Sequence, residues 1–504
     1  MRFYLALWAG KLIMWLSRVL GRGKGSSLPG MVALQICPSI LQRLGGQPRR
    51  GVVMTTGTNG KTTTNNMIAR VLEAAGLKTV VNAEGANLIT GVTTAFLRRA
   101  TFRGRVDCDY ALLEVDEASF PRVTRQVKPD VVVITNFFRD QLDRYGELDR
   151  TIALIRDALL ELPGAGHRSG QSGRGTVGEG AAAAMCRAGL GAGGGFGSRP
   201  AVTRLVLNAD DPLVARFAAA TGLPAVYYGL AEHPGVSRQA SAAREAKFCP
   251  CCGAELHYAY YHYSQLGSYR CPGCGFARPA AAVEGLAART AGTTVDCRVR
   301  YPGGERSLVI PVQGMYNLYN GLAAFTTGFL LGIDPAAALA ALSAYAPATG
   351  RMERFRYRGG KPVLLNLVKN PTGFNAGLSA LLAMDGPVDV LFAINDNAAD
   401  GRDISWLWDV DFEVLEEGRR EADRFICTGL RAAEMGVRLK YAGVPPERIF
   451  VCAGLDQAVR RTLDGPGKCA YLLATYTALW PVEKILSGSA EREQKHAASL
   501  PSVS

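Results

Sequence analysis

Two patterns of hydrophobic and polar residues alternate between residues 51 and 208. Short runs of β-branched and aliphatic residues predict buried strands, and apolar residues spaced three and four apart predict helices. Residues 51–55 (GVVMT) form the first run, and residues 61–75 follow with helical spacing until Gly76 ends the helix. Further strands are predicted at residues 110–115, 131–135 and 204–208. Strands and helices in this order build a parallel α/β sheet.

The same alternation starts afresh after Gly350. Strands are predicted at residues 363–367, 388–394, 425–428, 449–452 and 470–474, with helices between them. With 504 residues, the chain is too long for one ordinary hydrophobic core. A second, smaller α/β domain is therefore expected.

Two segments interrupt the first alternation. Residues 164–200 are rich in Gly, Ala and Ser and predict a disordered surface insertion, because they cannot bury enough apolar surface to order themselves. Residues 247–279 form a second insertion, which holds paired cysteines. The expected domains are an N-terminal helical segment (1–48), a central domain with both insertions (49–345) and a C-terminal domain (346–504).

The N-terminal segment is apolar from residue 3 to residue 20 but carries Lys11 and Arg18. A membrane-spanning helix needs about 20 largely uncharged residues. A signal peptide needs an uninterrupted apolar run and a small-residue cleavage site. The pattern predicts an amphipathic helix packed on the protein, and the alternative is a helix that rests on a membrane surface.

The formal charge of +13 favours an anionic partner or ligand without choosing among nucleotides, phosphorylated substrates, membranes and nucleic acids. Eight of the twelve cysteines are scattered, at positions 37, 108, 186, 251, 297, 427, 452 and 469. They do not form a disulfide framework, so a reducing cytoplasm fits best.

A phosphate-binding loop is predicted at residues 55–64 (TTGTNGKTTT), between a strand and a helix. Backbone N–H groups from Gly57 to Gly60, through Thr58 and Asn59, and from Thr63 on the following helix would wrap a phosphate chain. Lys61 would reach the terminal phosphates, and Thr62 would offer its hydroxyl to Mg²⁺. The strict pattern has Gly where this chain has Thr55, but the strand before and the helix after support an ATP site.

Three polar residues follow predicted strands, where ligands of parallel α/β sheets bind. Glu114 ends the run YALLE, and an unpaired carboxylate there would be costly to bury, so it is expected to bind Mg²⁺. Asn136 and Asn208 end two further runs and could hydrogen-bond an adenine edge or a phosphate. The alternative for both asparagines is that they only cap the next helices.

Six segments, in order and spacing, resemble the Mur ligase family: TGTNGKTTT, LLEVDE, TNFFRDQLDRYGE, LNADDP, GMYNLYN and GRMERF. The resemblance implies that ATP phosphorylates a substrate carboxylate and that an amine attacks the acyl phosphate. It also implies that Lys61 and Thr62 handle phosphate and Mg²⁺ and that Glu114 binds Mg²⁺. Residues implied around the nucleotide are Asn136, Asn208, Asp211, Asn317, Asn320 and Arg351.

Two departures from the family pattern stand out. Gln141 follows Asp140 where the family usually has a metal-binding His. The C-terminal domain begins with residues 367–371 (LVKNP), where the family usually has an Asp-Tyr-Ala-His-Asn-Pro-like segment. Both argue against the addition of an amino acid.

Four cysteines form a C-x2-C-x18-C-x2-C pattern, at Cys249, Cys252, Cys271 and Cys274. Four thiolates close a tetrahedral Zn²⁺ site without an open position, so the predicted zinc is structural. Cys251 lies inside the first turn and is expected to be a spectator. A redox dithiol pair and a nucleic-acid-binding ribbon are the alternatives. The segment between the two turns is aromatic and nearly uncharged, which argues against phosphate contact.

The ribbon and residues 395–412 (NDNAADGRDISWLWDVDF) resemble the MurT family, the ligase-like subunits of lipid II isoglutaminyl synthase. The resemblance implies a carbon–nitrogen ligase that amidates the α-carboxyl of D-glutamate in lipid II to D-isoglutamine. Ammonia would come from glutamine, hydrolysed by a separate GatD-like glutaminase in a heterodimer. The enzyme would act in the cytoplasm, at the inner face of the cell membrane.

A glutaminase centre within this chain is not expected. Of the five histidines, at positions 167, 233, 257, 262 and 496, none is placed to activate a cysteine. The MurT resemblance implies instead that Asp403 is catalytic, with orientation of a histidine on the partner as one role. A solvated, helix-capping loop is the alternative for this acidic segment.

The expected fold class is thus α/β. A Mur ligase-type parallel-sheet ATPase domain carries the four-cysteine zinc ribbon, and a smaller Rossmann-like domain follows. Two other functions compete with amidation. A Mur or folylpolyglutamate-type ligase would add an amino acid to a carboxylate. An ATP-switched module that holds nucleic acid would use the basic charge and the ribbon, but it leaves Glu114, Asn208 and Asp403 without a role, so no nucleic-acid partner is expected.

Overall fold

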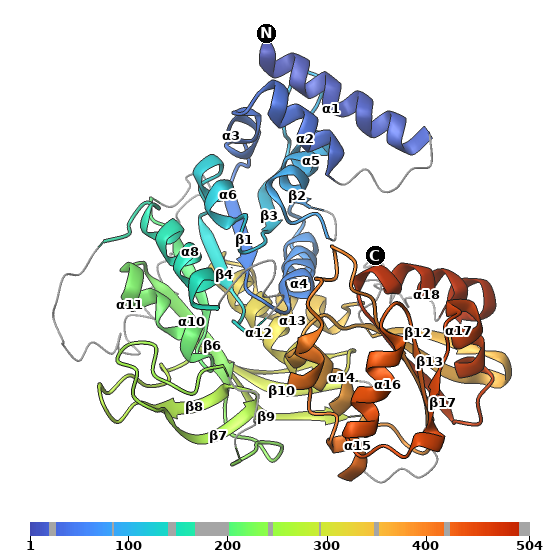
Figure 1. Ribbon diagram of the computed structural model, residues 1–504. Helices are drawn as coiled ribbons and strands as arrows, with labels where there is room; N and C mark the ends of the chain where they lie inside the picture. Colours follow the sequence, from blue (N-terminus) through green and yellow to red (C-terminus); the bar gives the residue numbers. More distant parts are fainter. Residues whose placement is uncertain are drawn as a thin grey trace, which may run out of the picture.

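The computed structural model describes residues 1–19, 27–82, 85–139, 148–166, 201–239, 245–291, 294–346, 352–417 and 424–492 (Figure 1). The predictions made for Asp140, Gln141 and Arg351 lie outside the described residues, as does most of the insertion expected at 164–200.

Three described helices precede the first strand, and α1 is the outermost element at one end of the molecule in Figure 1. They are α1 (Arg2–Val19), α2 (Leu28–Ile36) and α3 (Ile40–Gly45). Helix α1 packs on α2 and on α5 (Ile89–Arg99), with Ala6 and Leu7 fully buried between them. The helix expected near residues 3–20 is confirmed.

The central sheet has nine strands in the order β11-β10-β9-β6-β5-β4-β1-β3-β2. All neighbours from β2 to β9 are parallel, whereas β9, β10 and β11 pair antiparallel. The bounds are β1 (Gly51–Thr56), β2 (Thr79–Val81), β3 (Tyr110–Glu114), β4 (Val131–Ile134), β5 (Arg204–Asn208), β6 (Ala225–Leu230), β9 (Val283–Ala291), β10 (Thr294–Tyr301) and β11 (Gly304–Ile310).

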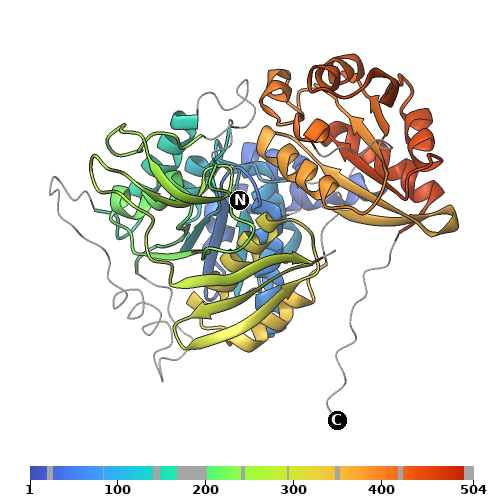
Figure 2. The same cartoon turned by 90° about the horizontal axis from the view of Figure 1, so that it is seen from below.

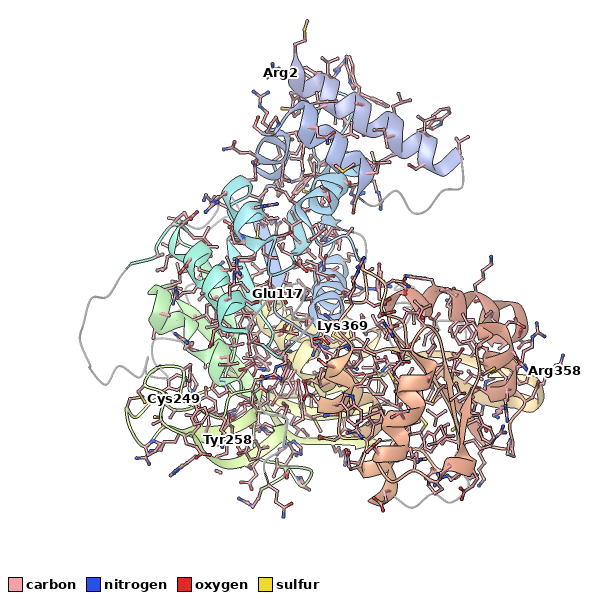
Figure 3. All side chains as sticks on the ribbon, in the orientation of Figure 1. Arg2, Glu117, Cys249, Tyr258, Arg358 and Lys369 are labelled. Carbon is pink, nitrogen blue, oxygen red and sulfur yellow. The ribbon has the colours of Figure 1, made fainter. Side chains whose placement is uncertain are left out.

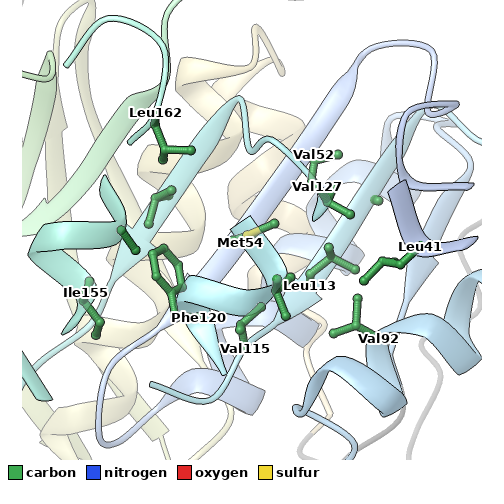
Figure 4. Packing of buried hydrophobic residues seen from close by; sticks show 14 of the residues in the cluster. Leu41, Val52, Met54, Val92, Leu113, Val115, Phe120, Val127, Ile155 and Leu162 are labelled. Carbon is green, nitrogen blue, oxygen red and sulfur yellow. The ribbon is translucent and has the colours of Figure 1, made fainter. Parts of the chain in front are cut away.

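Helices cover both faces of this sheet. One face packs against α4 (Lys61–Ala74), α12 (Met315–Leu330) and α13 (Pro335–Ser343). The other packs against α3, α5, α6 (Phe120–Gln126), α8 (Leu148–Leu160), α10 (Pro212–Ala215) and α11 (Phe217–Thr221). Figure 4 shows this second core, to which β3 contributes Leu113, α6 contributes Phe120 and α8 contributes Ile155. Successive residues of β1 alternate between the two cores, as the period of a strand requires.

The C-terminal sheet has seven strands in the order β16-β15-β14-β17-β13-β12-β18 and lies beside the central sheet (Figure 2). Strands β16 to β13 are parallel, and β12 and β18 are antiparallel. The strand bounds are β12 (Glu353–Tyr357), β13 (Lys361–Leu367), β14 (Val388–Ala393), β15 (Arg424–Thr428), β16 (Ile449–Val451), β17 (Cys469–Ala474) and β18 (Glu491–Arg492). Its helices are α14 (Pro371–Leu382), α15 (Val414–Glu417), α16 (Ala432–Tyr441), α17 (Leu455–Leu463) and α18 (Tyr476–Ser489), with 3₁₀ turns η1 (Arg358–Gly360), η2 (Ser405–Asp409) and η3 (Pro446–Arg448).

A separate two-stranded hairpin, β7 (His257–Tyr263) and β8 (Leu266–Arg270), carries the paired cysteines at its base. Each strand predicted from the sequence is present within two residues of its expected ends, and the α/β fold class is confirmed. Among the described residues, no helix combines the length and the apolarity that crossing a membrane requires.

Candidate active site

The loop between β1 and α4 needs glycine at two positions. Gly57 and Gly60 adopt φ values of +117° and +83°, which favour glycine. A Cβ atom on Gly60 would lie 2.2 Å from Oδ1 of Asn320, and one on Gly57 would lie 2.4 Å from Oγ1 of Thr135. The two glycines therefore lie where the backbone turns and where neighbouring side chains approach most closely.

Neighbouring side chains hold this loop in shape. The amide of Asn136 closes around Asn59, accepting its backbone N–H at 2.9 Å and donating to its carbonyl at 3.1 Å. Thr135 also donates to that carbonyl, at 2.8 Å. Thr58 donates to the carbonyl of Phe138 and accepts its N–H, both at 3.1 Å. The loop is thus pre-formed.

Lys61 is buried at the first turn of α4. Its ammonium donates to the carbonyl of Gly57 at 2.6 Å and to the Glu117 carboxylate at 2.8 Å. Burial acts to lower the pKa of Lys61, but the carboxylates of Glu117, Asp116 and Glu114 outweigh it and raise that pKa above its ordinary value. Lys61 therefore stays charged beside the loop. Glu117 was not predicted, although it lies three residues after Glu114 in the same motif.

Glu114 ends β3 directly beside Thr55 of β1. Its buried carboxylate accepts the side-chain N–H of Asn87 at 3.3 Å. The side-chain amide of Asn82 donates to the backbone carbonyl of Glu114 and accepts its backbone N–H, both at 2.9 Å. Thr62 is half-buried in the first turn of α4. Carboxylate and hydroxyl oxygens are the donors that Mg²⁺ takes, so Glu114 and Thr62 fit the ion in chemistry.

A cavity of about 80 Å³ adjoins the loop and opens toward the C-terminal sheet. Predicted residues that line it are Asn59, Gly60, Thr63, Asn136, Asn317 and Asn320. Tyr345, Asn366 and Gly373 also line it, the last two from the C-terminal part. A larger cavity of about 530 Å³ shares Tyr263, Tyr316, Thr372 and Ala376 with it. The two cavities occupy the junction of the two sheets.

Asn208 and Asp211 lie behind this cavity rather than on its wall. Asn208 donates to the carbonyl of Thr135 at 3.2 Å and accepts the N–H of Asp210 at 3.0 Å. Asp211 caps α10 through the N–H of Leu213 at 2.9 Å and accepts another N–H from Phe137 at 3.0 Å. Burial raises the pKa of Asp211 to about 7. Asp211 rather than Asn208 thus caps the next helix, and the hydrogen bonds of Asn208 hold its own turn and the backbone beside Asn136.

The C-terminal part contributes two residues that were not predicted. Lys369 and Asn370 follow β13, and Figure 3 shows Lys369 close to Glu117 at the junction of the two sheets. The side-chain amides of Asn370 and Asn59 exchange hydrogen bonds at 3.0 and 3.4 Å. The Lys369 ammonium donates to the carbonyl of Thr58 at 3.4 Å. The one signal for them in the sequence is the unusual segment after β13, where two polar residues follow a buried strand.

The acidic loop after β14 lies at the same carboxyl edge as Lys369, because β13, β17 and β14 are parallel neighbours. Two of its carboxylates are used inside the domain: Asp396 pairs with Arg431 at 2.5 Å, and Asp400 accepts the N–H of Thr477 at 2.7 Å. Asp403 is half-buried and accepts the N–H of Ser405 at 2.8 Å. That hydrogen bond lowers the pKa of Asp403, so its carboxylate is ionised at neutral pH.

The four predicted cysteines converge at the base of the β7–β8 hairpin, where Figure 3 labels Cys249. All four sulfur atoms lie within 4.8 Å of one another, and Cys249–Cys274 and Cys252–Cys271 are 3.6 and 3.4 Å apart. A tetrahedral zinc site with Zn–S bonds of about 2.3 Å sets its sulfur atoms about 3.8 Å apart. The cluster is therefore compatible with zinc. Cys251 is exposed and lies outside it, as expected.

Comparison with known proteins agrees with this geometry. The Mur ligase middle domain matches residues 55–161, and the MurT ligase C-terminal domain matches residues 367–479. The lipid II isoglutaminyl synthase (glutamine-hydrolyzing) subunit MurT of Staphylococcus aureus (strain COL) is 35% identical over 98% of this chain and 100% of its own length. The chain belongs to the MurT family. The MurT subunit of Streptococcus pneumoniae is 32% identical, over 92% of this chain and 93% of its own.

Solved structures share the fold of this MurT family member at low identity. The pseudomurein peptide ligase type C of Methanothermus fervidus has a TM-score of 0.60 at 21% identity, covering 88% of this chain and 80% of its own. MurF of Acinetobacter baumannii has a TM-score of 0.61 at 15% identity, covering 91% and 80%. As a member of the MurT family with a Mur ligase fold, the chain is a ligase, and the Mur ligase family implies ATP and Mg²⁺.

Proposed function

We propose that this chain is the synthase subunit of a lipid II isoglutaminyl synthase. It uses ATP to activate the α-carboxyl of D-glutamate in the stem peptide, and ammonia converts that carboxyl to the amide of D-isoglutamine. The observation that carries the proposal is membership of the MurT family over nearly the whole chain. The pre-formed loop with its buried lysine supports the ATP-dependent step.

Different residues of this chain would take separate roles in the reaction with ATP. The loop of residues 57–60 would wrap the phosphates while Asn136 holds the N–H groups of Thr58 and Asn59, and Lys61 would hold positive charge at the terminal phosphate. Thr62 and Glu114 would hold Mg²⁺, which, when bound, offsets phosphate charge. Lys369 approaches from the C-terminal part and adds a second ammonium group beside Thr58. The substrate carboxylate attacks the terminal phosphorus, ADP leaves, ammonia attacks the acyl carbon, and phosphate departs.

The remaining site assignments are proposals of the same kind. Asn136, Asn317 and Asn320 would face the nucleotide, since they line the small cavity. Asn208 and Asp211 would support it from behind. Arg351 would reach the phosphates. The domain limits of 1–48, 49–345 and 346–504 are proposed with them, as is a structural zinc ion on Cys249, Cys252, Cys271 and Cys274.

Ammonia would come from a glutaminase partner, in line with relatives that are named as subunits of a glutamine-hydrolyzing enzyme. The partner would be a GatD-like subunit in a heterodimer at the cytoplasmic face of the membrane. Asp403 would serve the partner's active site. Its ionised carboxylate forms no ion pair with another described residue, whereas that of Asp396 pairs with Arg431.

A choice of nucleophiles tests the function. The purified chain is given ATP, Mg²⁺ and lipid II with either ammonium chloride or a panel of free amino acids, and the products are analysed by mass spectrometry. Amidated lipid II with ammonium, and no product with the amino acids, is the expected result. Addition of an amino acid with equal or higher efficiency would favour the Mur or folylpolyglutamate type of ligase and overturn the proposal.

A further inference from the structure

Helix α1 exposes an unusual face. Tyr4, Leu5, Trp8, Leu12, Trp15 and Leu16 are each between 40% and 59% exposed. Their spacing of three, four and one places them along one side of the helix, which we call the outer face of α1. Single exposed apolar residues are ordinary, but a contiguous row that includes two tryptophans marks an interaction site.

The fold does not need the outer face, because the opposite side of α1 makes the packing contacts. Ala6 and Leu7 are fully buried. A Cβ atom on Gly10 would lie 2.8 Å from Leu97 of α5, so the two helices approach closely there. The helix is thus anchored by one apolar side while it presents another.

The segment after α5 contacts the outer face, and α2, which packs on α1, exposes two further apolar residues. Leu28 and Met31 of α2 are 49% and 41% exposed, and Phe102 after α5 is 72% exposed. The indole N–H of Trp8 donates to the carbonyl of Phe102 at 3.1 Å. Lys11 donates to the carbonyl of Leu97 at 3.0 Å, with its ammonium 5.2 Å from the centre of the Phe102 ring. The aromatic side chains and the 98–105 segment therefore form one surface.

The charge around this surface is positive. Residues 1–72 contain no Asp or Glu, and α1 itself carries Arg2, Lys11 and Arg18. The adjoining segment adds Arg98, Arg103 and Arg105, all exposed. Figure 3 shows Arg2 at the outer end of α1. An apolar helix face with cations around it is complementary to a surface that has an apolar interior and an anionic outer layer.

We propose that the outer face of α1 docks on the surface of an anionic lipid bilayer, with the helix lying in the interface plane. Trp, Tyr and Leu side chains would enter the headgroup boundary while Arg and Lys contact lipid phosphates. Lys11, in the middle of α1, donates to the carbonyl of Leu97, so its ammonium stays on the protein side of a helix that lies in the interface. The inference rests on the proposed function in one respect: a substrate anchored in the membrane gives the docking a purpose.

Vesicle binding without substrate tests this docking separately from the proposed activity. The purified full chain is sedimented with vesicles of phosphatidylglycerol and phosphatidylcholine, or of phosphatidylcholine alone, with neither ATP nor lipid II present. We expect binding to the anionic vesicles, a blue shift of tryptophan emission, and weakening of binding by salt. Equal binding to both vesicle types, or none to either, would overturn the proposal whatever the enzyme's activity.

Matched variants locate the contact. L12S/W15S should lower the partition onto anionic vesicles by about tenfold or more, because it removes two interfacial side chains. V309S/V437S, at two apolar residues that are 45% and 47% exposed elsewhere, should leave it unchanged. Unaltered binding by L12S/W15S, or a change only in its oligomeric state or partner binding, would identify a protein interface instead and contradict the proposal.

A measurement on the unaltered chain covers the case in which L12S/W15S fails to fold. Lipids with brominated acyl chains should quench tryptophan emission, because Trp8 and Trp15 would lie at the depth of the bromine atoms. Absence of quenching in bound wild-type chain would place α1 away from the bilayer.

Discussion

The phosphate loop and the acidic loop at 396–403 occupy equivalent places, each after an interior parallel strand of its sheet, yet they are built differently. The phosphate loop is closed by the hydrogen bonds that Thr58 and Asn59 donate from their backbone N–H groups to Asn136, and by a buried Lys61–Glu117 pair. In the acidic loop, Asp396 and Asp400 are used internally, while Asp403 accepts the backbone N–H of Ser405 and is half-buried.

This difference indicates that the first loop relies on residues of its own chain for its function, whereas the second relies on a partner. The first is pre-organised by its own chain, so its function depends on residues already in contact. The second presents an ionised carboxylate that forms no ion pair within the described part of the chain, which suits a group that acts on a partner. Between them, Lys369 and Asn370 join the C-terminal part to the phosphate loop. Substitutions in each region should therefore have separable effects.

The largest effect is expected at Lys61. K61A should lower amidation by about 10³-fold with either glutamine or ammonium, because it removes the cation at the phosphates. It should also destabilise the fold by about 3 kcal/mol, because Glu117 is left buried without its partner. The control K61A/E117Q should regain thermal stability but not activity. Activity of K61A within tenfold of wild type would remove the phosphate loop from the mechanism.

D403N should separate glutamine-driven from ammonium-driven amidation in the reconstituted two-subunit enzyme. The glutamine reaction should fall by about 10²-fold or more, because the carboxylate charge that orients the partner's base is lost. The ammonium reaction should change by no more than about twofold. Asn can still accept the Ser405 N–H, so the loop should keep its shape, and D385N at an exposed aspartate serves as the control. Full glutamine-driven activity in D403N would contradict the assignment.

A smaller effect is expected where the two parts meet. N370A removes both the exchange with Asn59 and the cap of α14, whose Gly373 N–H lies 2.8 Å from Asn370. D334A removes a comparable cap, of α13, at a distant place. Each should cost about 1 kcal/mol of stability. Only N370A should lower amidation, by about tenfold, because it loosens the approach of Lys369 to the loop. Equal amidation activity of the two variants would show that the contact between Asn370 and Asn59 has no role in amidation.

The ribbon should have the smallest effect on catalysis. C252S should lose bound zinc, measured by elemental analysis, and lower the unfolding temperature, because structural zinc contributes folding free energy. Amidation per folded molecule should stay within about twofold of wild type, since the cluster lies at the base of the hairpin rather than at either loop. C251S should keep its zinc. Zinc retained by C252S, or lost equally by C251S, would contradict the four-cysteine assignment.

Most of the parallel core could be predicted from the sequence, because β1, β3 to β5 and β13 to β17 are short, mostly apolar runs with helical spacing between them. The antiparallel extension β9 to β11 was not predicted. Its strands mix exposed charge with buried apolar residues, as in Val295, Cys297 and Val299. This alternation is itself the pattern of a half-buried strand, so the local signal was present, and only the antiparallel pairing needed the fold.

The residues of the candidate site also differ in how far the sequence could predict them. Lys61, Glu114 and the four cysteines belong to motifs whose spacing predicts their chemistry, and the structure brings the four cysteines together. Asn208 at a strand end and Asp211 at a helix N-cap show the limit of such motifs, because either residue can face the ligand or the fold, and here their hydrogen bonds go to the fold. Glu117, Lys369 and Asn370 act through contacts across long sequence separations, which no local pattern encodes.

Transfer of oxygen tests the central claim, carboxylate activation by ATP, most directly. Lipid II labelled with ¹⁸O in the α-carboxyl of its D-glutamate is amidated by the reconstituted enzyme, and the released phosphate is analysed by mass spectrometry. Attack of the carboxylate on the terminal phosphorus predicts one ¹⁸O atom in each phosphate released with amidated product. Unlabelled phosphate, formed while amidation proceeds, would show that no acyl phosphate lies on the path.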